Sequence, residues 1–174
     1  MGFQPTTAVE EAIRTRRTHK VYRPEPVPRE QLEALFELAR WAPNHHLTNP
    51  WRFRVLGPQS LAELKEADPA GAAKLDRAPT LVACSVVQTD DPQQNEEDVA
   101  AGACAVYIVM LAAHARGIAS YWRTPAVLRS PAGRAAARIP VEEHVLGLLH
   151  LGYADREWQA PDREPTERFV TYLD

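Results

Sequence analysis

The sequence predicts one globular domain of the α+β class. Its 174 residues, 45% of them apolar and 25% charged, have the length and balance of a single domain covering residues 1–174. Helical and strand patterns follow one another without the regular strand–helix–strand alternation of a parallel α/β fold. No internal repeat or low-complexity tract divides the chain.

Two helices are expected in the first part of the chain. Thr7-Ala8-Val9-Glu10 has the pattern of a capping box, which predicts a short helix that ends near Arg16. Pro28 stands where a second helix would begin, and that helix has to end before Pro43. Its apolar stripe is formed by Leu32, Leu35, Phe36 and Ala39.

The middle of the chain predicts a sheet. Strict alternation over 51–55 indicates a strand with one buried face, and the nearly continuous apolar run 80–87 indicates a central strand covered on both faces. Between them, 60–67 has the pattern of a surface helix that is interrupted at Pro69 and resumes over 70–75.

A long helix dominates the second half. After an expected polar loop at 89–97, an apolar helix is predicted from about Asp98 to Arg116, with Gly117 as its C-terminal cap. Further elements are a strand at 118–122, a small helix that Ser130-Pro131 opens, a strand at 144–153, and an alternating terminal segment at 169–173.

Composition argues against several classes of function. The formal net charge of −3 and pI of about 6.1 provide no positive field for nucleic acid, although 17 Arg outnumber 3 Lys. Residues 1–5 lack the pattern of a signal peptide, and the apolar stretch 99–113 is short of the ~20 residues that cross a bilayer. Cys84 and Cys104 are interpreted as buried thiols, so a cytoplasmic protein without membrane or nucleic-acid partners is expected.

Common catalytic motifs are missing: the sequence contains no phosphate loop, no dinucleotide fingerprint, no nucleophile elbow and no His-Glu-x-x-His. His45 and His46 are neighbours and should point in different directions. Because neither has a Cys or carboxylate three or four residues away, no metal site is predicted.

Three clusters of polar residues remain. Arg14–Lys20 could close around a phosphate with guanidinium, hydroxyl and ammonium groups, although cations at a helix end are also a common solvated feature. The second cluster, Ala42–His46 followed by Asn49-Pro50-Trp51, predicts a rigid loop with functional side chains. The third, Tyr121–Pro125, ends a strand with groups that suit a planar aromatic cofactor.

These clusters together resemble the FMN-dependent nitroreductase family, in its short single-domain branch of NAD(P)H nitroreductases. The likeness lies in Arg16-Arg17-Thr18, in Ala42-Pro43-Asn44-His45 with Asn49-Pro50-Trp51, in Trp122-Arg123-Thr124 and in Phe169-Val170-Thr171-Tyr172, and it runs through the whole chain. Departures are Thr18 for Ser, Asn49 for Gln, and Leu47 for an Asn that contacts the flavin in the family.

The resemblance implies a three-layer α-β-α sandwich with a mainly antiparallel sheet, and a homodimer with an exchanged C-terminal strand and the flavin at the interface. It implies that FMN is held by Arg16, Arg17, Thr18, Lys20, His45, Asn49, Trp122, Arg123 and Thr124. Because the flavin N5 atom carries the redox step, no catalytic side chain is expected.

The implied activity is transfer of hydride from NAD(P)H through FMN to nitroaromatic, quinone or related acceptors by a ping-pong mechanism. Two alternatives remain open at this stage. The same fold supports other flavin reactions, namely dehalogenation, oxidation and breakdown of the flavin itself. A flavin-binding protein without turnover is the second alternative.

Overall fold

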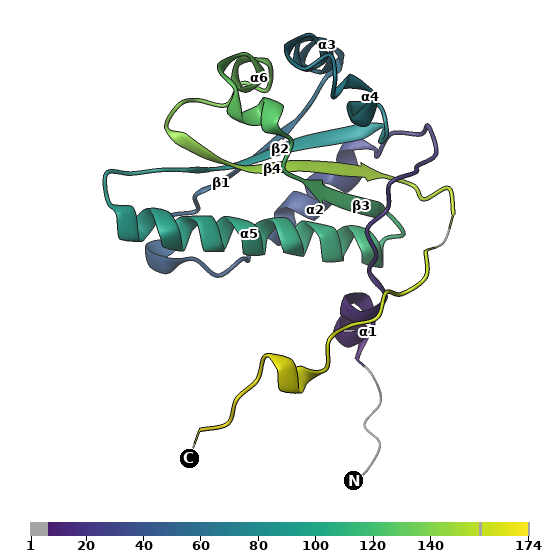
Figure 1. Ribbon diagram of the computed structural model, residues 1–174, viewed down its shortest axis with the longest axis vertical. Helices are drawn as coiled ribbons and strands as arrows, with labels where there is room; N and C mark the ends of the chain where they lie inside the picture. The colour runs from purple at the N-terminus through teal and green to yellow at the C-terminus, as the bar shows by residue number, and fades with distance from the viewer. Residues whose placement is uncertain (1–6, 157, 174) are drawn as a thin grey trace.

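A four-stranded antiparallel sheet lies at the centre of the molecule, between two layers of helices (Figure 1). The computed structural model describes residues 7–156 and 158–173. The strands are β1 (Trp51–Val55), β2 (Thr80–Val87), β3 (Ala119–Arg123) and β4 (Glu143–Gly152), and their order in the sheet is β1-β2-β4-β3. This arrangement confirms the α+β class, the three-layer sandwich and the antiparallel sheet.

The two helical layers cover opposite faces of the sheet. One layer consists of α2 (Arg29–Ala39) and α5 (Pro92–Ala115); the other consists of α3 (Pro58–Ala67), α4 (Ala72–Leu75) and α6 (Pro131–Ala136) (Figure 1). Side chains of the central strands point alternately to the two faces of the sheet. Val82 and Leu149 lie in the core between the sheet and the α2–α5 layer, and Leu81 and Leu148 lie in the core between the sheet and the α3–α6 layer.

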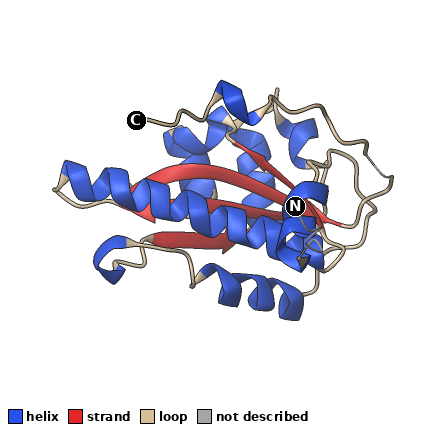
Figure 2. Ribbon diagram, turned by 90° about the horizontal axis from the view of Figure 1, so that it is seen from below, coloured by secondary structure: helices blue, strands red, loops and turns tan. Residues whose placement is uncertain are grey.

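The helix α5 crosses the whole width of the sheet, as Figure 2 shows. Its sheet-facing residues Ala101, Ala105, Val106, Val109, Met110, Ala112 and Ala113 are buried in the chain's own core. By length and composition α5 could also cross a membrane, but burial of one face against the sheet is typical of a core helix. Gly117 follows it with φ 72°, which confirms the predicted C-terminal cap.

The beginning of α5 differs from the prediction. The helix begins at Pro92, inside the segment 89–97 that was expected to be a polar loop. The Asp91 carboxylate caps it by accepting hydrogen bonds from the backbone N–H groups of Gln93 and Gln94, and proline suits the first helical turn. The capping residues therefore decide where the helix begins, although the segment is polar, and its polar residues form solvent-facing turns of α5.

The interpretation of Cys104 as a buried thiol is wrong, whereas Cys84 is buried in β2 as expected. Cys104 lies on the face of α5 that points away from the sheet, where Ala100 and Tyr107 are also exposed. Because successive residues of a helix point in different directions, Cys104 faces solvent although its neighbour Ala105 is buried, and an apolar run alone does not reveal this. Burial raises the pKa of the Cys84 thiol, so this sulfur stays protonated.

Both ends of the described chain extend beyond α5, away from the strands (Figure 1). The capping box of Thr7 and Glu10 forms as predicted and starts α1 (Ala8–Thr15), none of whose residues is buried. The segment 169–173 makes no strand within the described chain, and it follows a single 3-10 turn, η3 (Thr166–Arg168). Phe169, Tyr172 and Leu173 are exposed, so the predicted strand exchange with a partner stays a prediction.

Candidate functional site: a basic hollow beside strand β3

Four of the predicted site residues line one hollow of about 390 Å³. They are Arg16, Arg17, Thr18 and Lys20, which follow α1 in the sequence. The opposite wall comes from the C-terminal part of the chain, through Trp158, Gln159, Pro161 and Arg163. We call this feature the basic hollow.

The chain is held next to the sheet at this point by backbone contacts. Thr18 forms an isolated parallel bridge with Ser120 of β3, and the His19 N–H donates to the Ser120 carbonyl oxygen at 3.1 Å. The Arg17 guanidinium turns back, because its Nη1 donates to the carbonyl oxygens of Arg14 at 2.6 Å and Arg16 at 2.9 Å. The guanidinium of Arg17 therefore caps the end of α1 at the rim of the hollow.

The Arg16 guanidinium has a buried donor that is not paired within the part of the chain that the structure describes. Its Nη1 atom is buried and has no hydrogen-bond partner among the described residues. A buried, unpaired donor on a charged group is costly, and a phosphate oxygen is a strong acceptor that matches guanidinium geometry. The donors of the basic hollow are thus suited to a phosphate group such as that of FMN, which fits the sequence prediction for Arg16, Arg17, Thr18 and Lys20.

A second hollow, of about 480 Å³, is lined by Tyr121, Trp122, Arg123, Thr124 and Pro125 at the end of β3. The Trp122 indole N–H donates to the Leu146 carbonyl oxygen at 3.1 Å, which fixes the ring against β4. Arg123 Nη1 donates to the carbonyl oxygen of Lys74 at 3.4 Å, which links the hollow to α4. The predicted residues Trp122, Arg123 and Thr124 therefore form one surface.

The two hollows are neighbours. Lys20 of the basic hollow places its Nζ 5.9 Å from the centre of the Tyr121 ring, and Tyr121 lines the second hollow. The structure therefore brings together residues that two separate motifs, at 16–20 and 122–124, place about 100 positions apart in the sequence. A ligand with a phosphate at one end and a planar ring at the other would match this pair of hollows, with the phosphate in the basic hollow and the ring beside Trp122.

A buried histidine lies beneath Tyr121, and sequence reasoning missed it. The His150 side chain is fully buried, both ring nitrogens have no partner among the described residues, and its ring centre is 5.8 Å from that of Tyr121. Burial, together with the nearby guanidinium groups of Arg123 and Arg77, lowers the pKa of His150 to about 4. The sequence signal was a histidine within the apolar run of β4.

The loop with His45 and Asn49 lies elsewhere. It contains the 3-10 turn η1 (His45–Leu47), and His45 Nδ1 is 2.6 Å from Glu97 Oε2, near the beginning of α5. The expectation that His45 and His46 point in different directions is wrong: their rings stack with centres 3.8 Å apart. The positive φ of 55° at His46 breaks the regular turn and allows this stacking.

One chain does not bring His45 and Asn49 to the basic hollow. Next to Arg16, Thr15 Oγ1 lies 2.8 Å from Nε2 of His114, which is in the last turn of α5. Glu97 and His114 are 17 residues apart on one helix, which corresponds to about 25 Å at 1.5 Å per residue. Figure 1 shows α1 and the beginning of α5 at opposite ends of that helix.

Sequence reasoning also missed the contribution of the C-terminal region to the basic hollow. Trp158 and Arg163 lie in an irregular segment, and no hydrophobic period marks them. The one sequence signal was a second group of arginines, of which Arg156 lies over the Trp158 ring, with 4.8 Å between its Cζ and the ring centre.

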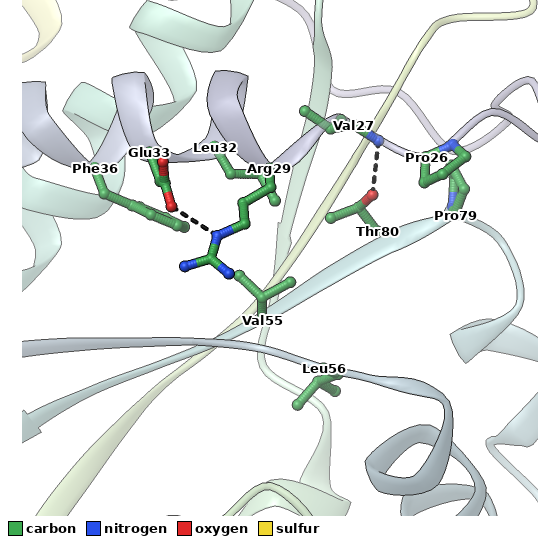
Figure 3. A pocket seen from close by; sticks show the side chains of 10 residues that line it. All are labelled: Pro26, Val27, Arg29, Leu32, Glu33, Phe36, Val55, Leu56, Pro79 and Thr80. Carbon is green, nitrogen blue, oxygen red and sulfur yellow. Dashed lines mark hydrogen bonds and ion pairs between the residues drawn. The ribbon is translucent and has the colours of Figure 1, made fainter.

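A further hollow, of about 530 Å³, lies between α2 and the ends of β1 and β2, and it contains none of the predicted site residues (Figure 3). Phe36, Leu32 and Val55 give it an apolar lining, and the Arg29 and Glu33 side chains form an ion pair at its side, as Figure 3 shows. The Thr80 hydroxyl oxygen accepts the Val27 N–H at 2.9 Å. Its lining is largely apolar, and its one guanidinium, that of Arg29, is paired with Glu33.

Comparison with known proteins identifies the family of this chain. The model of the nitroreductase family matches residues 13–88, which include the loop of His45 and strand β1. A proposed NAD(P)H nitroreductase of Haemophilus influenzae is 30% identical over 183 residues, which cover 92% of this chain and 97% of that protein. The chain belongs to the nitroreductase family.

Solved structures of nitroreductases share the fold. A nitroreductase-like family protein of Bacillus cereus superposes with a TM-score of 0.87 at 20% identity and covers 99% of both chains. A proposed nitroreductase of Desulfovibrio desulfuricans, solved in complex with FMN, superposes with a TM-score of 0.80 at 21% identity over 97% of this chain and 99% of that one. The fold is therefore that of the nitroreductases.

Proposed function

We propose that this nitroreductase binds FMN, takes hydride from NAD(P)H and reduces nitroaromatic, quinone or related acceptors by a ping-pong mechanism. The observation that carries the proposal is the buried and unpartnered Nη1 of Arg16 in the basic hollow. Two relatives support it: the Desulfovibrio desulfuricans structure holds FMN, and the name of the Haemophilus influenzae protein includes NAD(P)H. When bound, FMN supplies the redox chemistry of hydride transfer.

In this proposal the basic hollow holds the phosphate and ribityl end of FMN. Arg16 and Arg17 provide charge-assisted donors, Thr18 provides a hydroxyl, and Lys20 provides an ammonium group. Arg163 faces the same hollow and adds a third guanidinium. The hollow lined by Trp122, Arg123 and Thr124 takes the flavin ring, and the hydrogen bond of Trp122 to Leu146 holds the indole in place there.

A second copy of the chain completes the site. His45 and Asn49 lie about 25 Å along α5 from the basic hollow, so a two-fold arrangement would let the partner's loop reach the cofactor. The outward face of α5 is suited to such a contact, because Ala100, Cys104 and Tyr107 form an apolar stripe on it. The residues buried against the sheet, such as Ala105 and Val109, serve the core of their own chain.

The exposed terminal segment is suited to join the partner's sheet. Thr18 already pairs with Ser120 at the outer edge of β3, whereas the outer edge of β1 pairs with no strand in the described residues. The apolar hollow of Figure 3 lies next to Val55 at the end of β1. We infer that segment 169–173 adds at β1 of the partner, where its alternating side chains would cover apolar surface.

The visible spectrum of the purified full-length protein tests the function. We expect the absorption of a bound flavin and its bleaching when NADH or NADPH is added without oxygen, followed by recovery on addition of a quinone or nitroaromatic acceptor. A colourless protein that also fails to bind added FMN in a fluorescence titration would overturn the proposal. A bound flavin that neither donor bleaches would support a flavin-binding role without this reaction.

A further inference from the structure

The loop that carries His45 has a strained backbone. His46, Leu47 and Asn49 have φ values of 55°, 52° and 47°, in the left-handed region that residues other than glycine rarely adopt. Such conformations persist where the surrounding structure holds them, and they cluster at functional sites. Within the loop, the Asn49 N–H donates to Asn44 Oδ1 at 3.0 Å, and Asn49 Nδ2 donates to the Leu47 carbonyl oxygen at 2.7 Å.

Two adjacent carboxylates of α5 hold the loop. The Thr48 hydroxyl donates to Oδ1 of Asp98 at 2.6 Å, and Asp98 is 98% buried, since only 2% of its surface is exposed. Gln94 Nε2 donates to the same oxygen at 3.1 Å, so Asp98 is tied to its own helix as well. Glu97, one residue earlier, contacts the His45 ring at 2.6 Å.

The contact with Glu97 also decides which ring nitrogen of His45 carries the proton. The His45 hydrogen bond lowers the pKa of the Glu97 carboxyl, so this group is ionised and can only accept. Nδ1 of His45 is then the donor, and in the tautomer that carries its single proton on Nδ1 the Nε2 atom is an acceptor. Nε2 has no partner in the described residues, and the His46 ring stacks on one face of the imidazole.

We infer that Glu97 and Asp98 are positioning residues for the loop 44–49, which carries His45: Asp98 fixes its backbone through Thr48, and Glu97 orients His45 so that Nε2 points outward as an acceptor. The inference rests on the proposed function, in which His45 faces the flavin bound by the partner chain. An acceptor at this place would select a ligand that presents an N–H or O–H group, such as the flavin ring or its ribityl chain.

Nitrogen NMR of the full-length protein tests the arrangement without relying on activity. Histidine ¹⁵N shifts at neutral pH identify the protonated ring nitrogen, and we expect the neutral His45 ring to carry its proton on Nδ1. In Glu97→Ala the same signal should move toward a mixture of both tautomers. Glu96→Ala is the matched control, because Glu96 is the exposed neighbour and makes no hydrogen bond to a histidine among the described residues.

FMN affinity gives the second measurement. We expect Glu97→Ala to weaken FMN binding about two- to tenfold, which is the usual effect of one hydrogen bond, and Glu96→Ala to leave it unchanged. Thr48→Val should weaken binding similarly, while Thr48→Ser, which keeps the hydroxyl for Asp98, should restore it. In a double variant with His45→Ala, loss of Glu97 should add nothing further.

The outcomes separate the two proposals. A His45 ring with its proton on Nε2 in the wild type, or FMN affinity that is unchanged in Glu97→Ala and Thr48→Val, would overturn this inference alone. A wild-type protein that binds no FMN would overturn the proposed function and this inference with it. The tautomer shift in Glu97→Ala, combined with weaker FMN binding and rescue by Thr48→Ser, would support the inference.

Discussion

The indole ring of Trp122 lies against the backbone of Gly147 on the neighbouring strand. A methyl group added at Gly147 would stand 2.7 Å from Trp122 Nε1 and 2.2 Å from the Arg123 carbonyl oxygen. Gly147 also has a φ of 144°, next to the irregularity in the pairing of β2 with β4 between Cys84 and Ser85. The absence of a side chain at Gly147 thus allows Trp122 and Arg123 to pack directly against the backbone of β4.

We expect Gly147→Ala to destabilise the protein by more than about 2 kcal/mol, because it combines a steric clash with a strained backbone. The measurement is the free energy of unfolding in urea. Gly57→Ser is the matched control: nothing lies within 4 Å of an added Cβ there, and serine is a good N-cap at that position of α3. Equal stability of the two variants would contradict the close packing of Trp122 on β4.

Arg16→Ala should weaken FMN binding by about 10–100-fold, since a charge-assisted hydrogen bond to phosphate contributes roughly 1.5–3 kcal/mol. Turnover at saturating FMN should change little, because the phosphate end is far from the redox centre of the flavin. Fluorescence titration measures the affinity. Arg14→Ala, on the exposed face of α1, should keep wild-type affinity. Wild-type affinity in a folded Arg16→Ala would restore the interpretation of a solvated helix end.

Acid should destabilise the protein through His150. Its pKa is lowered from 6.5 to about 4 in the folded state, so the unfolded chain takes up the proton first as the pH falls. The contribution of His150 to the free energy of unfolding is fully present above about pH 6.5, and it is lost as the pH falls from about 6.5 to about 4. The total loss is about 3 kcal/mol, at 1.36 kcal/mol for each pKa unit.

The variant His150→Phe should remove this pH dependence, because both ring nitrogens lack partners and an apolar ring of similar size breaks no hydrogen bond. Unfolding free energies between pH 4 and pH 7 measure the effect. The exposed His144→Phe should retain the wild-type slope. A wild-type slope in His150→Phe as well would show that other groups cause the loss in acid.

Removal of the residues after Arg168 should weaken dimerisation. Phe169, Tyr172 and Leu173 are exposed in the single chain, and each side chain that a partner covers would contribute about 1.5–3 kcal/mol. Sedimentation of the full-length and truncated proteins at micromolar concentration measures the change in mass. A flavin-bound monomer of the full-length protein, or unchanged mass and melting temperature on truncation, would count against strand exchange.

Several features of the fold were predictable because they depend on local chemistry. The capping box of Thr7 and Glu10, the limit that Pro43 sets on α2, and the alternation of β1 each act within a few residues. The boundaries of β2 at Thr80 and Val87 also follow from its unbroken apolar run. The motif of Arg16, Arg17 and Thr18 was also predictable from the sequence, because its charged and hydrogen-bonding groups belong to consecutive residues.

Only the tertiary structure decided which of these groups meet. The sequence contained Arg16, Trp122 and His45 as three separate signals, and the sheet brings the first two together through the pairing of Thr18 with Ser120. The length of α5 keeps His45 apart from them and places it beside Glu97. Contacts between distant segments depend on strand register and helix length, which are set by packing over the whole core and which no short stretch of sequence contains.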